Sequence, residues 1–137
     1  MSGVLNGIKV IEWSVMQQAA VAGAILGDLG AEVIKIEPPT SDSARGLEDV
    51  LGTCPLLPGG RHALFEVWNR NKKGIALDLS KLKARQIVYR LVEQSDVFLT
   101  NYRRQKAKQL GLDYNSLRQY NSKLIYAVAS AFGPEGP

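Results

Sequence analysis

Short apolar runs alternate with longer segments of helical periodicity along this chain. Residues Leu5 to Trp13 contain an apolar run that is typical of a strand buried on both faces. Apolar positions in Gln17 to Leu29 recur at helical spacing, and Gly30 follows where helices commonly end in left-handed backbone. Glu32 to Glu37 predicts a second strand, which Pro38-Pro39 ends because proline cannot donate to a sheet ladder.

The alternation resumes after a long polar interval. Residues 40–62 are rich in Ser, Gly, Pro and Asp and predict a long loop, followed by a helical turn at Ala63 to Trp68. Ser80 and Asp113 are predicted as N-caps of later helices. Beyond residue 70 the pattern predicts strands at 75–77, 97–100 and 124–129 and helices at 81–94, 103–109 and 113–120. Strands that alternate with helices predict one α/β domain over residues 1–137, with a mainly parallel sheet and helices on both faces.

In an open parallel sheet, ligands bind beyond the carboxyl ends of the strands. The segment after the first strand, Ser14 to Gln18 (SVMQQ), lacks the GxGxxG of dinucleotide-binding folds, so an NAD or FAD site is disfavoured. The chain also lacks the GxxxxGK[ST] of P-loop NTPases. His62 and Cys54 are the single histidine and cysteine, so we assign no metal site and no catalytic residue.

The charge is unevenly distributed. The net charge is +4, but residues 1–60 carry −4 and residues 61–110 carry +8. A basic middle segment attracts phosphates, or it forms a solvated helix face. Nucleic-acid binding is unlikely because the aromatic and glycine interleaving of RNA-binding sheets is missing.

Two features bear on location. The chain has no apolar run approaching the roughly 20 residues that cross a bilayer. A single cysteine cannot form an internal disulfide, which suits a reducing compartment. We therefore expect a cytoplasmic protein without membrane contact.

Two strand ends and one helix carry candidate chemistry. Thr100 to Arg104 (TNYRR) combines an amide, a tyrosine and two guanidinium groups, which suit a phosphate and a stacked base. The alternative is a polar loop with Tyr102 anchored in the core. The basic Asn69 to Lys73 (NRNKK) precedes the second segment, Leu77 to Ser80 (LDLS). The GxxxG of Gly23 and Gly27 indicates close packing on a strand or, alternatively, close approach of a ligand.

These motifs occur in an order that resembles the N-terminal part of the class III CoA-transferases. This CaiB/BaiF group includes formyl-CoA transferase, carnitine CoA-transferase and the related α-methylacyl-CoA racemases. The resemblance rests on five ordered segments: GIKVIEW (Gly7 to Trp13), GDLGAEVIKIEPP (Gly27 to Pro39), NRNKKGIALDLS (Asn69 to Ser80), SDVFLTNYRR (Ser95 to Arg104) and LGLDYNSLRQYNSKLIYAVASAFGPEGP (Leu110 to Pro137).

The resemblance implies a Rossmann-like large domain that binds coenzyme A or an acyl-CoA thioester, in proteins that form interlocked homodimers. Carried over by position, the CoA contacts fall on three strand ends: Gln17 and Gln18; Leu77, Asp78, Leu79 and Ser80; and Asn101, Tyr102 and Arg103. Gln17 matches a glutamine that lies near the acyl group of the substrate in members similar to formyl-CoA transferase. The chain departs from the family pattern at Gln18-Ala19-Ala20, where Ala-Gly-Pro is usual, and at Tyr102 to Gln105, where many members have Phe-Arg-Pro-Gly.

In the transferases an aspartate forms the covalent intermediates, and in the racemases a histidine and an aspartate move the α-proton. The resemblance places both sets after the terminal Gly133-Pro134. We therefore expect the chain to be a CoA-binding part of a CoA-transferase, an incomplete large domain that is inactive alone. The alternatives are a freestanding small domain for nucleotide binding or protein assembly, a racemase fragment, and, less favoured, a nucleic-acid binder.

Overall fold

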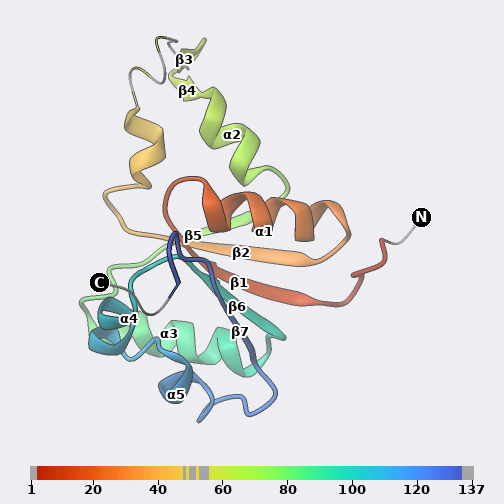
Figure 1. The fold of residues 1–137 in the computed structure, drawn as a ribbon, viewed down its shortest axis with the longest axis vertical. Helices are drawn as coiled ribbons and strands as arrows, with labels where there is room; N and C mark the ends of the chain where they lie inside the picture. Colours follow the sequence, from red (N-terminus) through yellow and green to blue (C-terminus); the bar gives the residue numbers. More distant parts are fainter. Residues whose placement is uncertain (1–2, 48, 50–51, 53–55, 134–137) are drawn as a thin grey trace.

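The computed structural model describes residues 3–133 apart from 48, 50–51 and 53–55. Cys54 and residues 134–137 lie outside this part of the chain. The described residues form a five-stranded sheet with helices on both faces and a two-stranded hairpin that projects from one side (Figure 1).

Outside residues 40–62 the elements follow the order that the sequence predicts. The strands are β1 (Lys9–Trp13), β2 (Glu32–Glu37), β3 (Leu56–Leu57), β4 (Arg61–His62), β5 (Lys73–Ala76), β6 (Val97–Thr100) and β7 (Ile125–Val128). The helices are α1 (Gln18–Asp28), the 3-10 turn η1 (Ser43–Gly46), α2 (Ala63–Asn69), α3 (Leu82–Glu93), α4 (Arg104–Leu110) and α5 (Tyr114–Leu117). Among the described helices none is long and apolar enough to cross a membrane.

The main sheet has the strand order β5-β2-β1-β6-β7, and every pair in it is parallel. This confirms the predicted α/β class with a mainly parallel sheet. The chain first builds outward from β1 through β2 to β5, and then returns to the other side of β1 with β6 and β7. The order therefore reverses between β1 and β6, and such a switch point is where open parallel sheets bind ligands.

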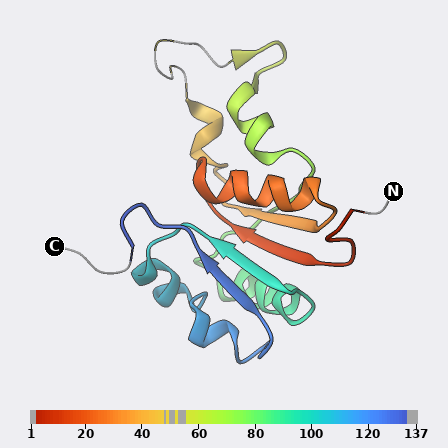
Figure 2. The same cartoon turned by 45° about the vertical axis from the view of Figure 1, so that its right-hand side comes forward.

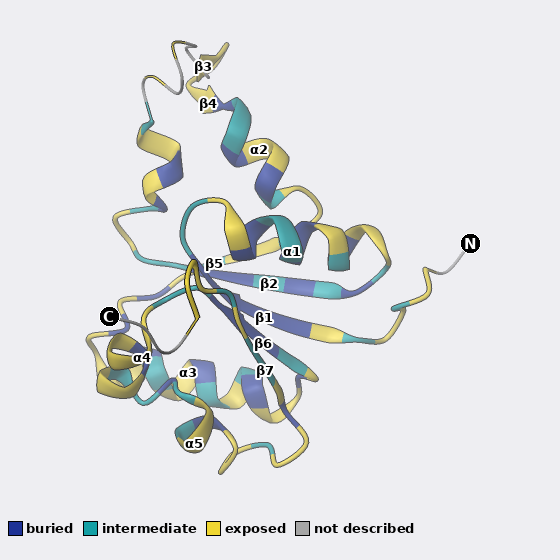
Figure 3. Cartoon of the chain, in the orientation of Figure 1, coloured by how far each residue is buried: buried dark blue, intermediate teal, exposed yellow. Residues whose placement is uncertain are grey.

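Helices cover the two faces of the sheet unequally (Figure 2). Helices α3, α4 and α5 lie on one face, where Phe98, Val88 and Leu117 belong to the largest apolar cluster. Helix α1 lies on the other face, where Val10, Val33 and Ala19 form a second cluster. The buried residues follow these two interfaces, and the outer sides of the helices are exposed (Figure 3).

The predicted long loop at 40–62 holds a turn and a hairpin. Asp42 caps η1 by accepting from the Ala44 N–H, and β3 pairs antiparallel with β4. This segment packs back on the start of α1 through a third cluster, in which Ala44, Phe65 and Trp68 surround Ala20. The segment 40–62 is thus packed next to the loop that follows β1.

Several element boundaries differ from the prediction, and β5, for example, begins at Lys73 rather than at residue 75. The first strand begins at Lys9 rather than Leu5, because residues 4–7 form a turn and Gly7 has φ +90°. Ser80 does not cap α3. Its hydroxyl donates to Asp78 Oδ1 at 2.6 Å, and the N-cap position falls on Lys81. Asp113 does cap α5, but that helix ends at Leu117 rather than near Tyr120.

Candidate functional site

The carboxyl edge of the sheet is hollowed next to the β1/β6 switch point. A cavity of about 620 Å³ opens between the start of α1, the loop after β6 and the loop after β7. Its lining residues come from those three segments: Gln18; Asn101, Tyr102, Arg103 and Arg104; and Val128 to Ala131 with Gly133. We call this hollow the switch-point cavity.

A smaller cavity of about 220 Å³ lies on the other side of Tyr102, and we call it the side cavity. It is lined by the segment Leu77 to Ser80 together with Trp13, Pro38, Pro39, Tyr102, Lys106 and Leu110. Tyr102 belongs to both cavities, so the two hollows are neighbours along one edge. The three predicted strand-end segments therefore meet at this edge.

Tyr102 is held by stacking. Its ring lies on the indole of Trp13, with centroids 4.1 Å apart and an interplanar angle of 17°. Burial, and to a lesser extent the charge of Asp42, raises the pKa of the Tyr102 phenol. Because Trp13 is itself 3 % exposed, one face of Tyr102 is anchored in the core. This agrees with the alternative interpretation of the segment as a polar loop whose tyrosine is anchored in the core. The phenol is neutral near pH 7 and forms a wall between the two cavities.

The individual candidate residues differ in what they can offer a ligand. Leu77 and Leu79 line the side cavity but belong to the main core, where they are 8 % and 9 % exposed. Asp78 and Ser80 are exposed and bonded to each other, and the hydrogen bonds from Ser80 lower the pKa of the Asp78 carboxyl. Arg103 is exposed at the mouth of the switch-point cavity.

The two glutamines lie at the start of α1. Gln17 is exposed at the N-cap position of the helix, and Gln18 lines the switch-point cavity. The Gln18 side-chain amide donates to the carbonyl of Ser130 at 3.3 Å, which links α1 to the loop after β7. Asn101 reaches back to the loop after β1, where its side chain bonds both backbone groups of Val15.

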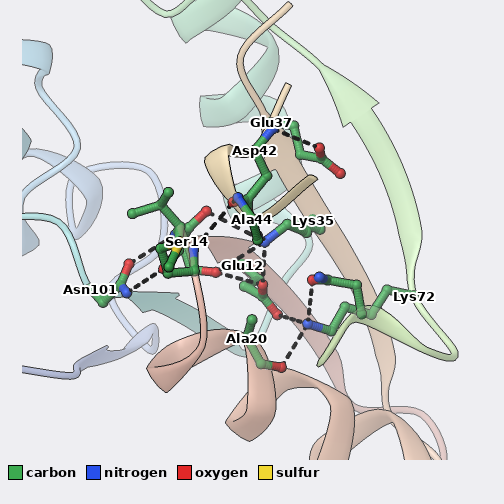
Figure 4. Close-up of polar contacts among 12 residues, drawn as sticks. Glu12, Ser14, Ala20, Lys35, Glu37, Asp42, Ala44, Lys72 and Asn101 are labelled. Atoms are coloured by element: carbon green, nitrogen blue, oxygen red, sulfur yellow. Dashed lines mark hydrogen bonds and ion pairs between the residues drawn. The ribbon is translucent and has the colours of Figure 1, made fainter. Parts of the chain in front are cut away.

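A buried group of charges lies directly behind this edge and escaped the sequence analysis (Figure 4). Lys35 on β2 is 2 % exposed, and its Nζ lies 3.2 Å from Glu12 Oε1 and 3.0 Å from Asp42 Oδ2. Lys72 Nζ lies 2.7 Å from Glu12 Oε2, with its side chain 2 % exposed. We call these four residues the buried ion cluster.

The buried ion cluster balances two carboxylates against two ammonium groups. Further polar contacts complete it: Ser14 donates to Glu12 at 2.7 Å, and Lys72 donates to the carbonyl of Ala20 at 2.7 Å. Burial lowers the pKa of Lys72, against the opposing effect of Glu12. Since Glu12, Lys35 and Lys72 are 0–2 % exposed, the cluster is a support for the edge rather than a reactive group open to substrate.

The GxxxG of α1 packs on this cluster. A Cβ at Gly23 would overlap the Glu12 carboxylate, and one at Gly27 would come within 3.2 Å of the Asn71 carbonyl oxygen. The close-packing interpretation of Gly23 and Gly27 is therefore correct. His62, the single histidine, is buried and caps α2 by accepting from the Phe65 N–H.

The chemistry that the edge can support is binding of an anionic ligand. Arg103 and Arg104 line the switch-point cavity and Lys106 lines the side cavity, so each cavity has at least one cationic side chain in its lining. Guanidinium groups suit phosphate oxygens. Across the described residues no three His, Cys, Asp or Glu side chains gather in a way that could hold a metal ion.

Comparison with known proteins places these features in a family. A family model described as CoA-transferase family III matches residues 5–137. The chain is 35% identical over 136 residues to the cinnamoyl-CoA:phenyllactate CoA-transferase of Clostridium sporogenes, covering 99% of the chain and 32% of that protein. It is 38% identical over 133 residues to a probable fatty acyl-CoA transferase of Mycobacterium tuberculosis, covering 97% and 33%.

Solved structures agree with the sequence comparison. The crystal structure of a CAIB/BAIF family protein from Brucella suis matches with a TM-score of 0.87 and 35% identity, over 100% of this chain and 36% of that one. The chain spans about a third of the length of the curated relatives that it matches. The resemblance to class III CoA-transferases and the fold class are thereby confirmed.

Proposed function

Because the chain belongs to CoA-transferase family III, we propose that it binds a coenzyme A thioester along the carboxyl edge of its sheet. The observation that carries this proposal is the convergence of three segments at that edge. Gln18, Leu77 to Ser80 and Asn101 to Arg103 are far apart in sequence, yet they line two cavities that share Tyr102. Gln17 precedes Gln18 at the N-cap of α1. The edge lies at the β1/β6 switch point, where open parallel sheets bind ligands.

The charges at the edge suit this ligand. Coenzyme A carries phosphate groups, and Arg103 and Lys106 stand at the mouths of the two cavities. The pair Trp13 and Tyr102 gives the wall between them an apolar, aromatic surface. We propose that the phosphates lie toward these cations and that the thioester end lies toward Gln17 at the start of α1.

Replacing Arg103 with alanine tests this assignment. Since Arg103 is exposed and carries no packing role, the variant should fold normally but bind CoA about tenfold more weakly, a loss of about 1.4 kcal/mol. Isothermal titration calorimetry of both proteins with CoA measures the difference. The control is Arg90→Ala, because Arg90 lies on α3 beside the opposite edge of the sheet, near Lys9 and Gln94.

The Arg103→Ala titration has two results that would count against the site. Equal CoA affinity in the wild type and the Arg103→Ala variant would remove Arg103 from the site. An equal loss in the Arg90→Ala variant would show that the affinity reflects overall positive charge rather than this edge. The expected result is a loss confined to Arg103→Ala, with a salt dependence that is weaker than in the wild type.

The proposal extends to the assembly and the location of the protein. We propose that it acts as a homodimer in the cytoplasm, the latter in keeping with its single cysteine. Exposed apolar side chains on the edge strand β7, Ile125 at 62 % and Val128 at 45 %, support association.

A freestanding binding or assembly domain remains the second candidate. The observation that favours it is the same exposed strand β7, whose free edge can pair with another chain. The two candidates differ in one respect that calorimetry measures. A CoA thioester domain should discriminate CoA from other nucleotides, whereas an assembly domain should be indifferent to both.

A further inference from the structure

The geometry points to Asn101 as a positioning residue that sets the backbone after β1, rather than as a side chain that contacts the ligand. This inference rests on the proposed function, because the backbone in question leads directly into Gln17 and Gln18. The resemblance placed Asn101 among the CoA contacts, but its side chain is already engaged within the protein.

Both polar atoms of the Asn101 amide are bonded to one residue on the neighbouring loop. Its Oδ1 accepts from the Val15 N–H at 3.0 Å, and its Nδ2 donates to the Val15 carbonyl at 2.7 Å. Figure 4 shows these two bonds reaching from the end of β6 to the loop after β1. A two-bond contact of this kind fixes both the position and the orientation of the Val15 peptide groups.

The next residue has a backbone that needs such support. Met16 has φ +60°, in the left-handed region that side chains other than glycine rarely adopt. Its N–H donates to Asp42 Oδ1 at 3.2 Å, and Asp42 is itself fixed by Lys35 and by the Ala44 N–H. Asn101 on one side and Asp42 on the other therefore hold two consecutive peptides of the loop.

The consequence for the site is geometric. Gln17 follows Met16 at the N-cap of α1, and Gln18 lines the switch-point cavity. A change in the Val15 and Met16 backbone would move both glutamines relative to Tyr102 and Arg103. Small displacements of groups that bind a ligand weaken binding substantially even when no contacting residue is altered. We infer that Asn101 contributes to ligand affinity through this loop.

The test compares two asparagines that have similar bonds in different places. Asn121 also bridges backbone groups, since its Nδ2 donates to the carbonyls of Val92 and Ser95 near the opposite edge of the sheet. Asn101→Ala and Asn121→Ala each remove a half-buried amide and its bonds, so both should lower stability to a comparable extent. Amide hydrogen exchange, followed residue by residue by NMR, and CoA titration are then measured for both.

In the Asn101→Ala variant we expect the exchange of the Val15 and Met16 amides, relative to amides of the β1 core, to quicken about tenfold. CoA affinity should fall about tenfold, which corresponds to about 1.4 kcal/mol. The Asn121→Ala variant should leave both quantities at their wild-type values. Asn101→Asp keeps an acceptor for the Val15 N–H, so it should restore protection at Val15 in part.

Two results would overturn the inference. Unchanged exchange at Val15 and Met16 in Asn101→Ala would show that the loop holds its shape without Asn101. An equal effect of Asn121→Ala on exchange or affinity would reduce the role of Asn101 to general stability. If the wild-type chain does not bind CoA, the proposed function fails, but the exchange of Val15 and Met16 still decides whether Asn101 sets the loop.

Discussion

Replacing Lys35 with methionine should destabilise the protein by about 3–5 kcal/mol, the cost of removing one partner from a buried ion pair. Lys35 is 2 % exposed and lies between Glu12 and Asp42. Its removal leaves two buried carboxylates, Glu12 and Asp42, with Lys72 as the one remaining cation of the cluster. Lys72 lies 2.7 Å from Glu12 and makes no ion pair with Asp42. The methionine side chain has a similar length and apolar body, so the loss reports the charge rather than a cavity. Urea unfolding of wild type and variant measures the difference.

Lys73→Met is the matched control. Lys73 lies on β5, beside β2, and pairs with Glu32 at 2.5 Å, but its side chain is 71 % exposed. An exposed pair of this kind contributes little to stability, because solvent screens it. We therefore expect a difference of several kcal/mol between two lysine-to-methionine changes on adjacent strands. Similar losses from Lys35→Met and Lys73→Met would show that the buried ion cluster is not a major determinant of stability.

Replacing Gly23 with alanine should destabilise the protein by about 3 kcal/mol, at the upper end of typical overpacking costs. In an exposed helix the same change stabilises by about 1 kcal/mol, because alanine has the higher helix propensity. At Gly23 a Cβ would overlap the Glu12 carboxylate. That carboxylate cannot retreat freely, since Ser14, Lys35 and Lys72 hold it in place. The sign of the effect therefore tests how tightly α1 packs on the buried ion cluster.

Gly74→Ala provides the comparison for Gly23→Ala. Gly74 lies on the edge strand β5, and a Cβ at this position would have no neighbouring atom within 4 Å. Its replacement should change the free energy of unfolding by about 0.5 kcal/mol or less. A stabilised Gly23→Ala variant, measured by the same urea titration, would mean that Glu12 is free to move aside. The buried ion cluster would then be looser than the distances indicate.

The sequence predicted the order of elements well, because apolar periodicity is a local property. The β1-α1-β2 unit, the left-handed Gly30 after α1 and the strand at 97–100 all follow from residues within a few positions of one another. Boundaries were less accurate where local polar contacts compete. At Ser80 the neighbouring Asp78 accepts the hydroxyl, and this shifts the start of α3.

The convergence of the three candidate segments could be anticipated, because the ends of parallel strands share one edge. The buried ion cluster that supports this edge could not be anticipated from the sequence. Glu12 and Lys35 interrupt apolar runs, and in a strand such residues usually face solvent. Glu12 pairs with Lys35 and Lys72, which lie 23 and 60 positions later, so this pairing required the fold. Asp42 lies only seven positions after Lys35, but in an irregular loop whose path back to Lys35 the sequence does not indicate. The signal that was available is a charged residue within each of two central strands of a sheet covered on both faces.

The interpretation of Asn101 changed for the same reason. Its position after β6 placed it at the ligand edge, as the sequence indicated. Only the fold shows that Val15, 86 positions earlier, takes both of its polar atoms. Residues that line a binding edge therefore divide into those with an exposed charged side chain, such as Arg103, and those whose polar atoms are already bonded within the protein, such as Asn101.

The central claim is that coenzyme A binds along the carboxyl edge at the β1/β6 switch point, and an NMR titration of the isotope-labelled 137-residue chain tests it most directly. Added CoA should shift the backbone amides of residues 14–18, 77–80 and 101–103 in a saturable manner. Amides at the opposite edge, around Gln94 and Asn121, should stay in place. Shifts centred on that opposite edge, or no saturable shifts at all, would contradict the account.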